Sequence, residues 1–150
     1  MEHDRLTGWQ RLCLLLPGLL QAAAGLWALL DPRSWYDQFP GDGRAWVSTL
    51  GPYDEHLVRD AGVGLLAVAV LLVWAAAVPE RRLTQAAIGT WLVFQVPHFA
   101  YHLTTLDAFP LADDVATVAT FALAITLPLA VLAGTRRSRT QAPAGEMPRP

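Results

Sequence analysis

Four apolar stretches separated by polar segments organise the chain of 150 residues. They lie at 12–30, 61–78, 83–103 and 115–134, and each holds 18 to 21 residues. A helix needs about 20 apolar residues to cross roughly 30 Å of hydrocarbon. The pattern therefore predicts an all-α fold, a four-transmembrane-helix bundle in one membrane domain of residues 1–134. The predicted helices cover about 9–30, 53–78, 83–105 and 112–134.

The segments outside these helices differ in character. The connection 31–53, between the first two helices, spreads aromatic side chains among charged and turn residues: Trp35, Tyr36, Phe39 and Trp46. Aromatic residues of this kind usually anchor at the membrane interface, and a short interfacial helix and a lid over the mouth of the bundle are both compatible with the pattern. The tail 135–150 is rich in Arg, Pro and small polar residues, which predicts a disordered, basic cytoplasmic segment.

Composition supports a membrane protein. The chain is 53% hydrophobic and only 16% charged, whereas a soluble domain carries about 25% charged residues. A cleavable signal peptide is disfavoured because the first apolar stretch exceeds the ~7–15 residues of a signal core. The single Cys13 allows no intramolecular disulfide, and a net charge of −2 gives no support for nucleic-acid binding.

Arginine placement predicts the orientation, since the chain has no lysine. With both termini cytoplasmic, eight arginines lie inside (Arg5, Arg11, Arg81, Arg82, Arg136, Arg137, Arg139, Arg149) and three outside (Arg33, Arg44, Arg59). The positive-inside rule favours this arrangement, N-in and C-in, which for this chain we expect in a bacterial plasma membrane. The acidic residues of the connections then gather at the outer mouth.

The third predicted helix has one polar face. Trp91, Gln95, His98 and His102 share a stripe at helical spacing, with Tyr101 at its edge. Pro97 lies within the same helix and leaves a backbone carbonyl without its usual partner. Ionisable residues inside membrane segments are rare and are taken as functional by default.

The second predicted helix carries a similar group near its outer end. His56 and Asp60 are four residues apart, with Arg59 beside them and Glu55 in the first turn. Gly62 and Gly64, further along, favour close packing of helices. Because both helices bring their histidines to the outer half of the bundle, we expect His56, Asp60, His98 and His102 to converge in one pocket.

Three imidazoles and one carboxylate are a sufficient ligand set for a transition metal, namely Zn, Fe or Cu, and haem is a less favoured variant. Glu55, Asp60 and Tyr101 are the candidate acids and bases, and Arg59, Gln95 and Trp91 are the candidate supporting or substrate-contacting residues. Simpler interpretations are open as well. The histidines and glutamines can serve as hydrogen bonds between helices, and Arg59 with Asp60 can be a structural ion pair.

Three function classes follow from this pattern. The first is a metal-binding enzyme acting on a lipophilic small molecule. The second is a metal-free acid–base enzyme, of isomerase or cyclase type, on an isoprenoid or sterol-like substrate. The third is a non-catalytic accessory or binding subunit of a membrane complex. The expected partners are the lipid bilayer, a lipophilic small molecule and, in the third class above all, a second copy or another membrane protein.

The layout of four short helices, a long aromatic first outer loop and a compact tail resembles small DoxX-like membrane proteins, and the lysine-free, Ala/Leu/Arg-rich usage is similar to that of actinobacterial chains. The resemblance covers the four apolar stretches, about two-thirds of the chain. It implies a fold and assigns no catalytic residue. The stretches EHLVRD and PHFAYH remain the specific features of this sequence.

Overall fold

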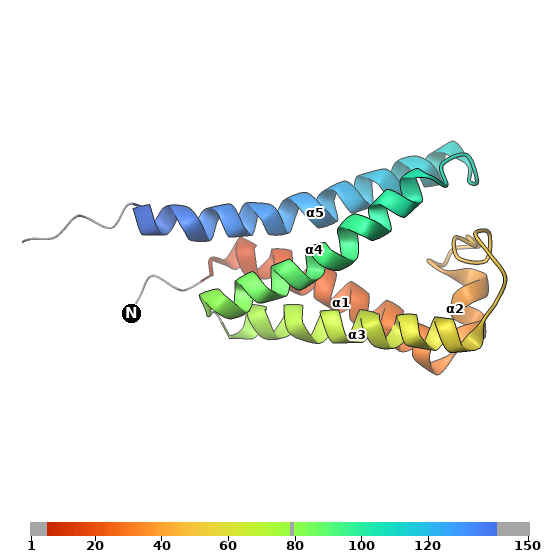
Figure 1. Cartoon of the computed structure of the whole chain (residues 1–150), viewed down its shortest axis with the longest axis horizontal. Helices are drawn as coiled ribbons and strands as arrows, with labels where there is room; N and C mark the ends of the chain where they lie inside the picture. Colours follow the sequence, from red (N-terminus) through yellow and green to blue (C-terminus); the bar gives the residue numbers. More distant parts are fainter. Residues whose placement is uncertain (1–5, 79, 141–150) are drawn as a thin grey trace, which may run out of the picture.

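A computed structural model describes residues 6–78 and 80–140, with side chains described as far as residue 134. This part of the chain is helical throughout and contains no strand. Its helices are α1 (Gly8–Leu30), α2 (Pro32–Gln38), α3 (Glu55–Ala77), α4 (Arg81–Leu103) and α5 (Leu111–Thr140). The four long helices run back and forth along one axis, so α1 begins and α5 ends at the same end of the molecule (Figure 1).

Among the described residues, three helices are long and apolar enough to cross a membrane: α1, α3 and the segment Leu111–Gly134 of α5. They identify the chain as an integral membrane protein. The prediction of four spans was wrong, because α4 does not qualify. Arg81 and Arg82 open this helix, and Gln95, His98 and His102 add further polar side chains to its second half.

The first connection contains a short helix, which was one of the structures left open for it, and the boundary of the tail needs a correction. The loop between the first two long helices contains a helix of its own, α2, which Pro32 begins and the Asp31 carboxylate caps by accepting a hydrogen bond from the Ser34 N–H at 3.1 Å. Helix α5 continues past Gly134 to Thr140, into the segment predicted to be disordered. The rest of that tail, residues 141–150, lies outside the described residues.

Helices α1 and α3 form the most closely packed pair of the bundle. They cross where two glycines meet, and a Cβ added at Gly25 would lie 2.8 Å from the backbone oxygen of Gly62. A Cβ at Gly62 would in turn lie 2.9 Å from the backbone oxygen of Gly25. Only residues without a side chain allow two helix backbones to approach so closely, as is common in membrane helix pairs. The expectation of close packing is therefore confirmed for Gly62 and wrong for Gly64, where an added Cβ would meet nothing within 4 Å.

The main apolar core lies toward the end of the bundle where α1 begins. Leu14, Leu72, Ile88 and Val131 come from the four long helices and are fully buried there. Toward the other end α4 and α5 diverge from α1 and α3, and α2 with the loop after it lies at this end (Figure 1). The second cluster of buried residues, which includes Trp35, Tyr36 and Val58, packs this loop region against α1 and α3. The four long helices are thus packed together at one end of the molecule and separated at the other, which we call the divided end.

We predict that Gly62→Ala lowers the free energy of unfolding by about 1–3 kcal/mol, because the new methyl group would press on backbone atoms that cannot rotate away. Gly64→Ala is the matched control, since a Cβ there meets nothing within 4 Å and alanine favours the helix. Denaturant unfolding in detergent, followed by circular dichroism, compares the two variants. Equal stability of both would contradict the close crossing.

Candidate functional site

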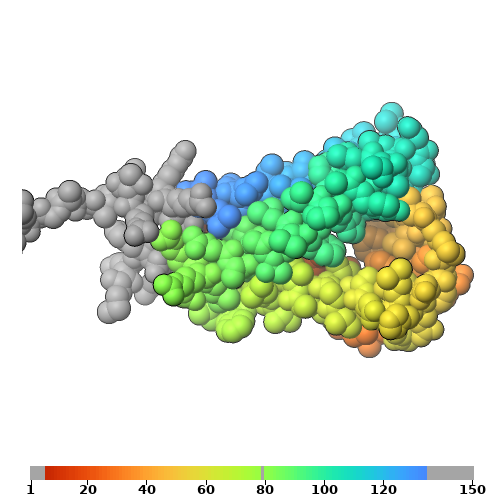
Figure 2. Space-filling model, viewed as in Figure 1, coloured from red at the N-terminus to blue at the C-terminus, as the bar shows by residue number. Residues whose placement is uncertain are grey.

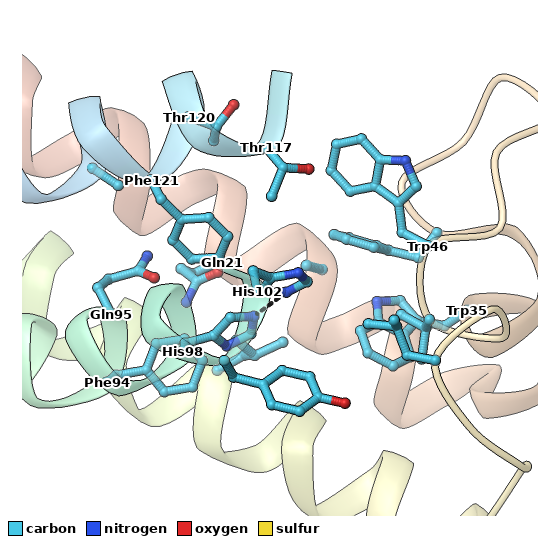
Figure 3. A pocket seen from close by; sticks show the side chains of 17 residues that line it. Gln21, Trp35, Trp46, Phe94, Gln95, His98, His102, Thr117, Thr120 and Phe121 are labelled. Atoms are coloured by element: carbon cyan, nitrogen blue, oxygen red, sulfur yellow. Dashed lines mark hydrogen bonds between the residues drawn. The ribbon is translucent and has the colours of Figure 1, made fainter. Parts of the chain in front are cut away.

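A cavity of about 570 Å³ fills the divided end of the bundle. All four long helices, α2 and the loop after it contribute to its wall, which is overwhelmingly apolar. Its polar or aromatic lining residues include Gln21, Trp35, Trp46, Phe94, Gln95, His98, Tyr101, His102, Thr117, Thr120 and Phe121. Figure 3 shows the two histidines in the middle of this group, between the glutamines and the loop tryptophans. Cavities of this size and character are typical of small-molecule sites.

His98 and His102 form a direct pair. Their rings stack with centroids 4.9 Å apart and planes inclined by 19°, and their Nε2 atoms lie 3.0 Å apart (Figure 3). The phenyl ring of Phe121, from α5, lies 5.1 Å from each of the two rings. Helical spacing of four residues on α4 creates the stack, and the aromatic contact from α5 fixes it. The pair is therefore an ordered feature of the cavity wall.

The 3.0 Å contact constrains protonation. A neutral imidazole has one nitrogen that donates and one that accepts, whereas an imidazolium only donates. An Nε2–H on one ring can bind the other Nε2 only if that second nitrogen carries a lone pair. At least one of the two rings is therefore neutral in this geometry, and the pair can take up one proton at the free nitrogen of the donating ring while it keeps this hydrogen bond.

Gln95 and Gln21 bring amide groups into the same cavity from α4 and α1. Gln95 is 7% exposed, and its Oε1 accepts no hydrogen bond among the described residues. The Nε2 of Gln21 is likewise buried without a partner in the described part of the chain. The alternative that these glutamines serve as hydrogen bonds between helices thus finds no support at these two atoms.

The cavity opens to the side of the molecule. Figure 2 shows this face hollowed between α4 and the α2–α3 end of the molecule. Tyr101, at the edge of the cavity, is 52% exposed. A molecule can therefore approach the histidine pair from the side of the bundle.

The predicted group on α3 lies elsewhere. The His56 and Asp60 side chains are 88% and 64% exposed, and they pair with each other at 3.2 Å between Nε2 and Oδ2. Neither residue lines the cavity. Helix α3 turns the face with Val58, Gly62 and Leu65 inward, where these residues are buried. His56 and Asp60 therefore lie on its outer face.

Glu55 and Arg59 also remain outside the cavity. The Arg59 Nε donates to Glu55 Oε1 at 2.9 Å, and Arg59 Nη1 donates to the backbone oxygen of Leu29. This arginine covers one of the carbonyls left open at the end of α1, so its role here is structural. The predicted ion pair of Arg59 with Asp60 is replaced by one with Glu55.

The expected convergence of three histidines and Asp60 does not occur. The described residues contain no group of three or more His, Cys, Asp or Glu side chains that could hold one metal ion. Of the predicted site residues, the structure gathers Gln95, His98, Tyr101 and His102 around one cavity. The remaining predicted ligands and acids, His56, Asp60 and Glu55, point away from it.

Trp91 has a structural contact of its own. It is 2% exposed, and its Nε1–H donates to the backbone oxygen of Ala124 at 2.6 Å. Within α5 that oxygen would accept from residue 128, but Pro128 has no N–H to donate. The indole therefore supplies the hydrogen bond that the proline removes, and it joins α4 to α5 just beside the cavity.

Most of the opposite wall of the cavity was not predicted from the sequence. Thr117, Thr120, Phe121 and Ala124 line the cavity from α5 at spacings of three, one and three residues. This is the spacing of one helix face, and the threonines within an apolar span were the available signal. The loop aromatics Trp35, Phe39 and Trp46 line the cavity too, so this loop covers the site, one of the two interpretations left open for it.

An ion pair ties the loop to α5. The Arg44 Nε lies 3.0 Å from Asp113 Oδ1, and the Asp113 side chain is 15% exposed. The Arg44 guanidinium also lies 5.9 Å from the centre of the Trp46 ring. The loop segment that lines the cavity is thereby held against the first turn of α5.

No family model, curated protein or solved structure matches the chain. The resemblance to DoxX-like proteins therefore stays a prediction from hydropathy and loop layout. Function has to be argued from the geometry of the cavity.

We predict that Trp91→Phe lowers the free energy of unfolding by about 1–3 kcal/mol, because the half-buried Ala124 oxygen loses its donor. The loss in free energy of unfolding caused by Trp91→Phe should be smaller in a Pro128→Ala background. There the backbone N–H restored at residue 128 can donate to the same oxygen within α5. A double-mutant cycle by denaturant unfolding measures the coupling. Additive effects of the two substitutions would contradict the assigned role.

Proposed function

We propose that this membrane protein takes a lipophilic small molecule into the cavity and transfers a proton to and from it through the His98–His102 pair. The observation that carries the proposal is the pair itself, two stacked imidazoles with Nε2 atoms 3.0 Å apart in the wall of an apolar cavity. Histidine is the usual general acid–base catalyst near neutral pH. An apolar wall with few polar groups suits a lipophilic substrate.

The pair suits a reaction that needs a base and an acid in turn. The lone pair of one ring removes a proton from a carbon of the bound molecule, and the proton is then shared with the second ring. The pair returns the proton to another carbon, and the double bond shifts between them. This isomerisation is balanced without an oxidant, a reductant or a co-substrate, and it fits an isoprenoid or sterol-like compound.

The acids Asp60 and Glu55 have no part in this version of the acid–base proposal, because their side chains are not at the cavity. Tyr101 is the remaining oxygen acid beside the pair, with its ring centroid 5.9 Å from that of His102. Its place at the cavity edge suits a hydroxyl that contacts the substrate as it enters.

The bundle also supports an orientation. Arg11, Arg81 and Arg82 belong to the end where α1 begins and α5 ends (Figure 1). We place that end at the cytoplasmic face of a bacterial plasma membrane, in accordance with the positive-inside rule. The cavity then lies near the outer face.

Filling the cavity should remove a bound molecule. We predict that Ala24→Phe, at the cavity wall, abolishes copurification of a lipophilic compound, whereas Ala23→Phe, the same change at the exposed neighbouring position, preserves it. Solvent extraction of purified protein followed by mass spectrometry compares both variants with the wild type. A compound present equally in all three would be bound elsewhere, and the proposal would fail.

Proton transfer has its own readout. When the wild-type protein is incubated in heavy water with the compound it carries, we expect the compound to gain carbon-bound deuterium. His98→Gln and His102→Gln keep a polar side chain but cannot act as a base, so exchange should fall by at least about 100-fold. Mass spectrometry of the extracted compound measures the gain, and Gln85→Ala, outside the cavity, is the control.

Metal binding by the same pair is the second candidate. The two Nε2 atoms face each other at 3.0 Å, close to the spacing of two imidazoles on one ion with bonds of about 2.0–2.1 Å. The described protein supplies two such ligands, and an oxygen of the substrate would add another. Under the acid–base proposal, isotope exchange survives chelation. About one equivalent of Zn, Fe or Cu in untagged protein, lost in His98→Ala, would favour the second candidate instead.

A further inference from the structure

The cavity wall contains an unusual number of polar atoms without partners. Five buried side-chain atoms in the described part of the chain make no hydrogen bond, and four of them belong to residues that line this cavity. The four atoms are Gln21 Nε2, Trp35 Nε1, Trp46 Nε1 and Gln95 Oε1. Buried polar groups in proteins are nearly always paired, so their gathering around one space points to a ligand that pairs with them.

The chemistry of the four atoms specifies that ligand. An amide nitrogen and two indole nitrogens only donate, and the amide oxygen of Gln95 only accepts. A group placed between Gln21 and Gln95 satisfies both when it accepts and donates at once, as a hydroxyl does. Near the tryptophans the ligand must instead offer an acceptor oxygen, such as a carbonyl.

The two requirements lie at opposite ends of the site. Figure 3 shows Gln21 and Gln95 on one side of the histidine pair and Trp35 and Trp46 on the other. Gln95 is 7% exposed and Trp35 is 9% exposed, so both belong to the buried framework of the protein. A single elongated molecule that meets both ends would pass directly over the two imidazoles.

Charge is excluded by the composition of the wall. None of the described residues that line the cavity is Asp, Glu, Lys or Arg. An ionised group would lose its hydration there without meeting a permanently charged side chain of opposite sign, which is strongly unfavourable. The volume of about 570 Å³ suits one small molecule.

From these observations we propose that the cavity selects a neutral, elongated lipophilic molecule with a hydroxyl at the Gln21–Gln95 end and an acceptor oxygen at the Trp35–Trp46 end. This inference rests on the proposed function, because it names the substrate class of the same site. It goes further in assigning recognition to four residues that take no part in proton transfer.

Two matched series of probes test it, each titrated against protein in nanodiscs, with occupancy read by native mass spectrometry. The rigid series is testosterone, with a ketone at one end and a hydroxyl at the other, androstenedione, with ketones at both ends, and the anionic testosterone sulfate. The open-chain series is 12-methoxydodecan-1-ol and 1,12-dimethoxydodecane. In each series the ends are changed while the apolar body is kept.

In at least one series we expect the hydroxyl compound to bind about tenfold more tightly than its hydroxyl-free partner, because only a hydroxyl donates to Gln95 Oε1. The sulfate should bind at least about 100-fold more weakly than testosterone. Gln95→Leu should abolish the preference for the hydroxyl without lowering the thermal stability of the ligand-free protein, since the oxygen it removes is unpaired.

Trp35→Phe keeps an aromatic ring against Phe39 and removes the indole N–H. It should therefore weaken the binding of both members of a probe pair by the same factor. Trp74→Phe, at an exposed position of α3, is the control and should change nothing. Equal affinity of the hydroxyl compound and its hydroxyl-free partner in both series would overturn this inference alone. Binding of testosterone sulfate as tight as that of testosterone would do the same. Absence of binding in both series would overturn it together with the proposed function.

Discussion

The close contact between α1 and α3 is the constraint on which the rest of the structure depends. Two helix backbones meet at Gly25 and Gly62 with no room for a side chain between them. This contact fixes which face of α3 turns inward, and it leaves His56 and Asp60 on the outer face. It also joins α1 and α3 into a unit against which α4 and α5 lean at one end and diverge at the other. The cavity is the space that this divergence leaves.

The protein treats its polar groups in two different ways. Two backbone carbonyls left open in helices are paired by side chains: the indole of Trp91 satisfies the one that Pro128 leaves open, and Arg59 satisfies that of Leu29 at the end of α1. Around the cavity, the amides of two glutamines and the N–H groups of two tryptophans keep atoms without partners. Four of the five unpaired buried side-chain atoms in the described part of the chain thus belong to the cavity wall, which makes their unpaired state a property of the site.

Periodicity within one helix was the reliable part of the sequence information. The stripe that joins Gln95, His98 and His102 depends only on the geometry of α4, and these residues do line one cavity, although their polarity also disqualifies α4 as a span. The predicted metal site depended on which face α3 turns toward the other helices. That face is set at Gly62 by contacts with α1, a helix that lies far away in the sequence. A loop of irregular backbone has no period from which its contacts can be read, so the role of Trp46 became visible only in three dimensions.

The hollow between α4 and the α2–α3 end of the molecule determines the phase, lipid or water, relative to which the affinity for the proposed ligand is measured (Figure 2). A lipophilic compound that reaches the cavity sideways comes from the bilayer, where it is already concentrated. Burial of ten methylene groups favours hydrocarbon over water by about 8 kcal/mol, or roughly six powers of ten. A site that binds its ligand with a millimolar constant relative to the lipid is then equivalent to a nanomolar site relative to water. Under the proposed function, weak contacts with the polar ends would be sufficient for occupancy, and they would let the product return to the membrane quickly.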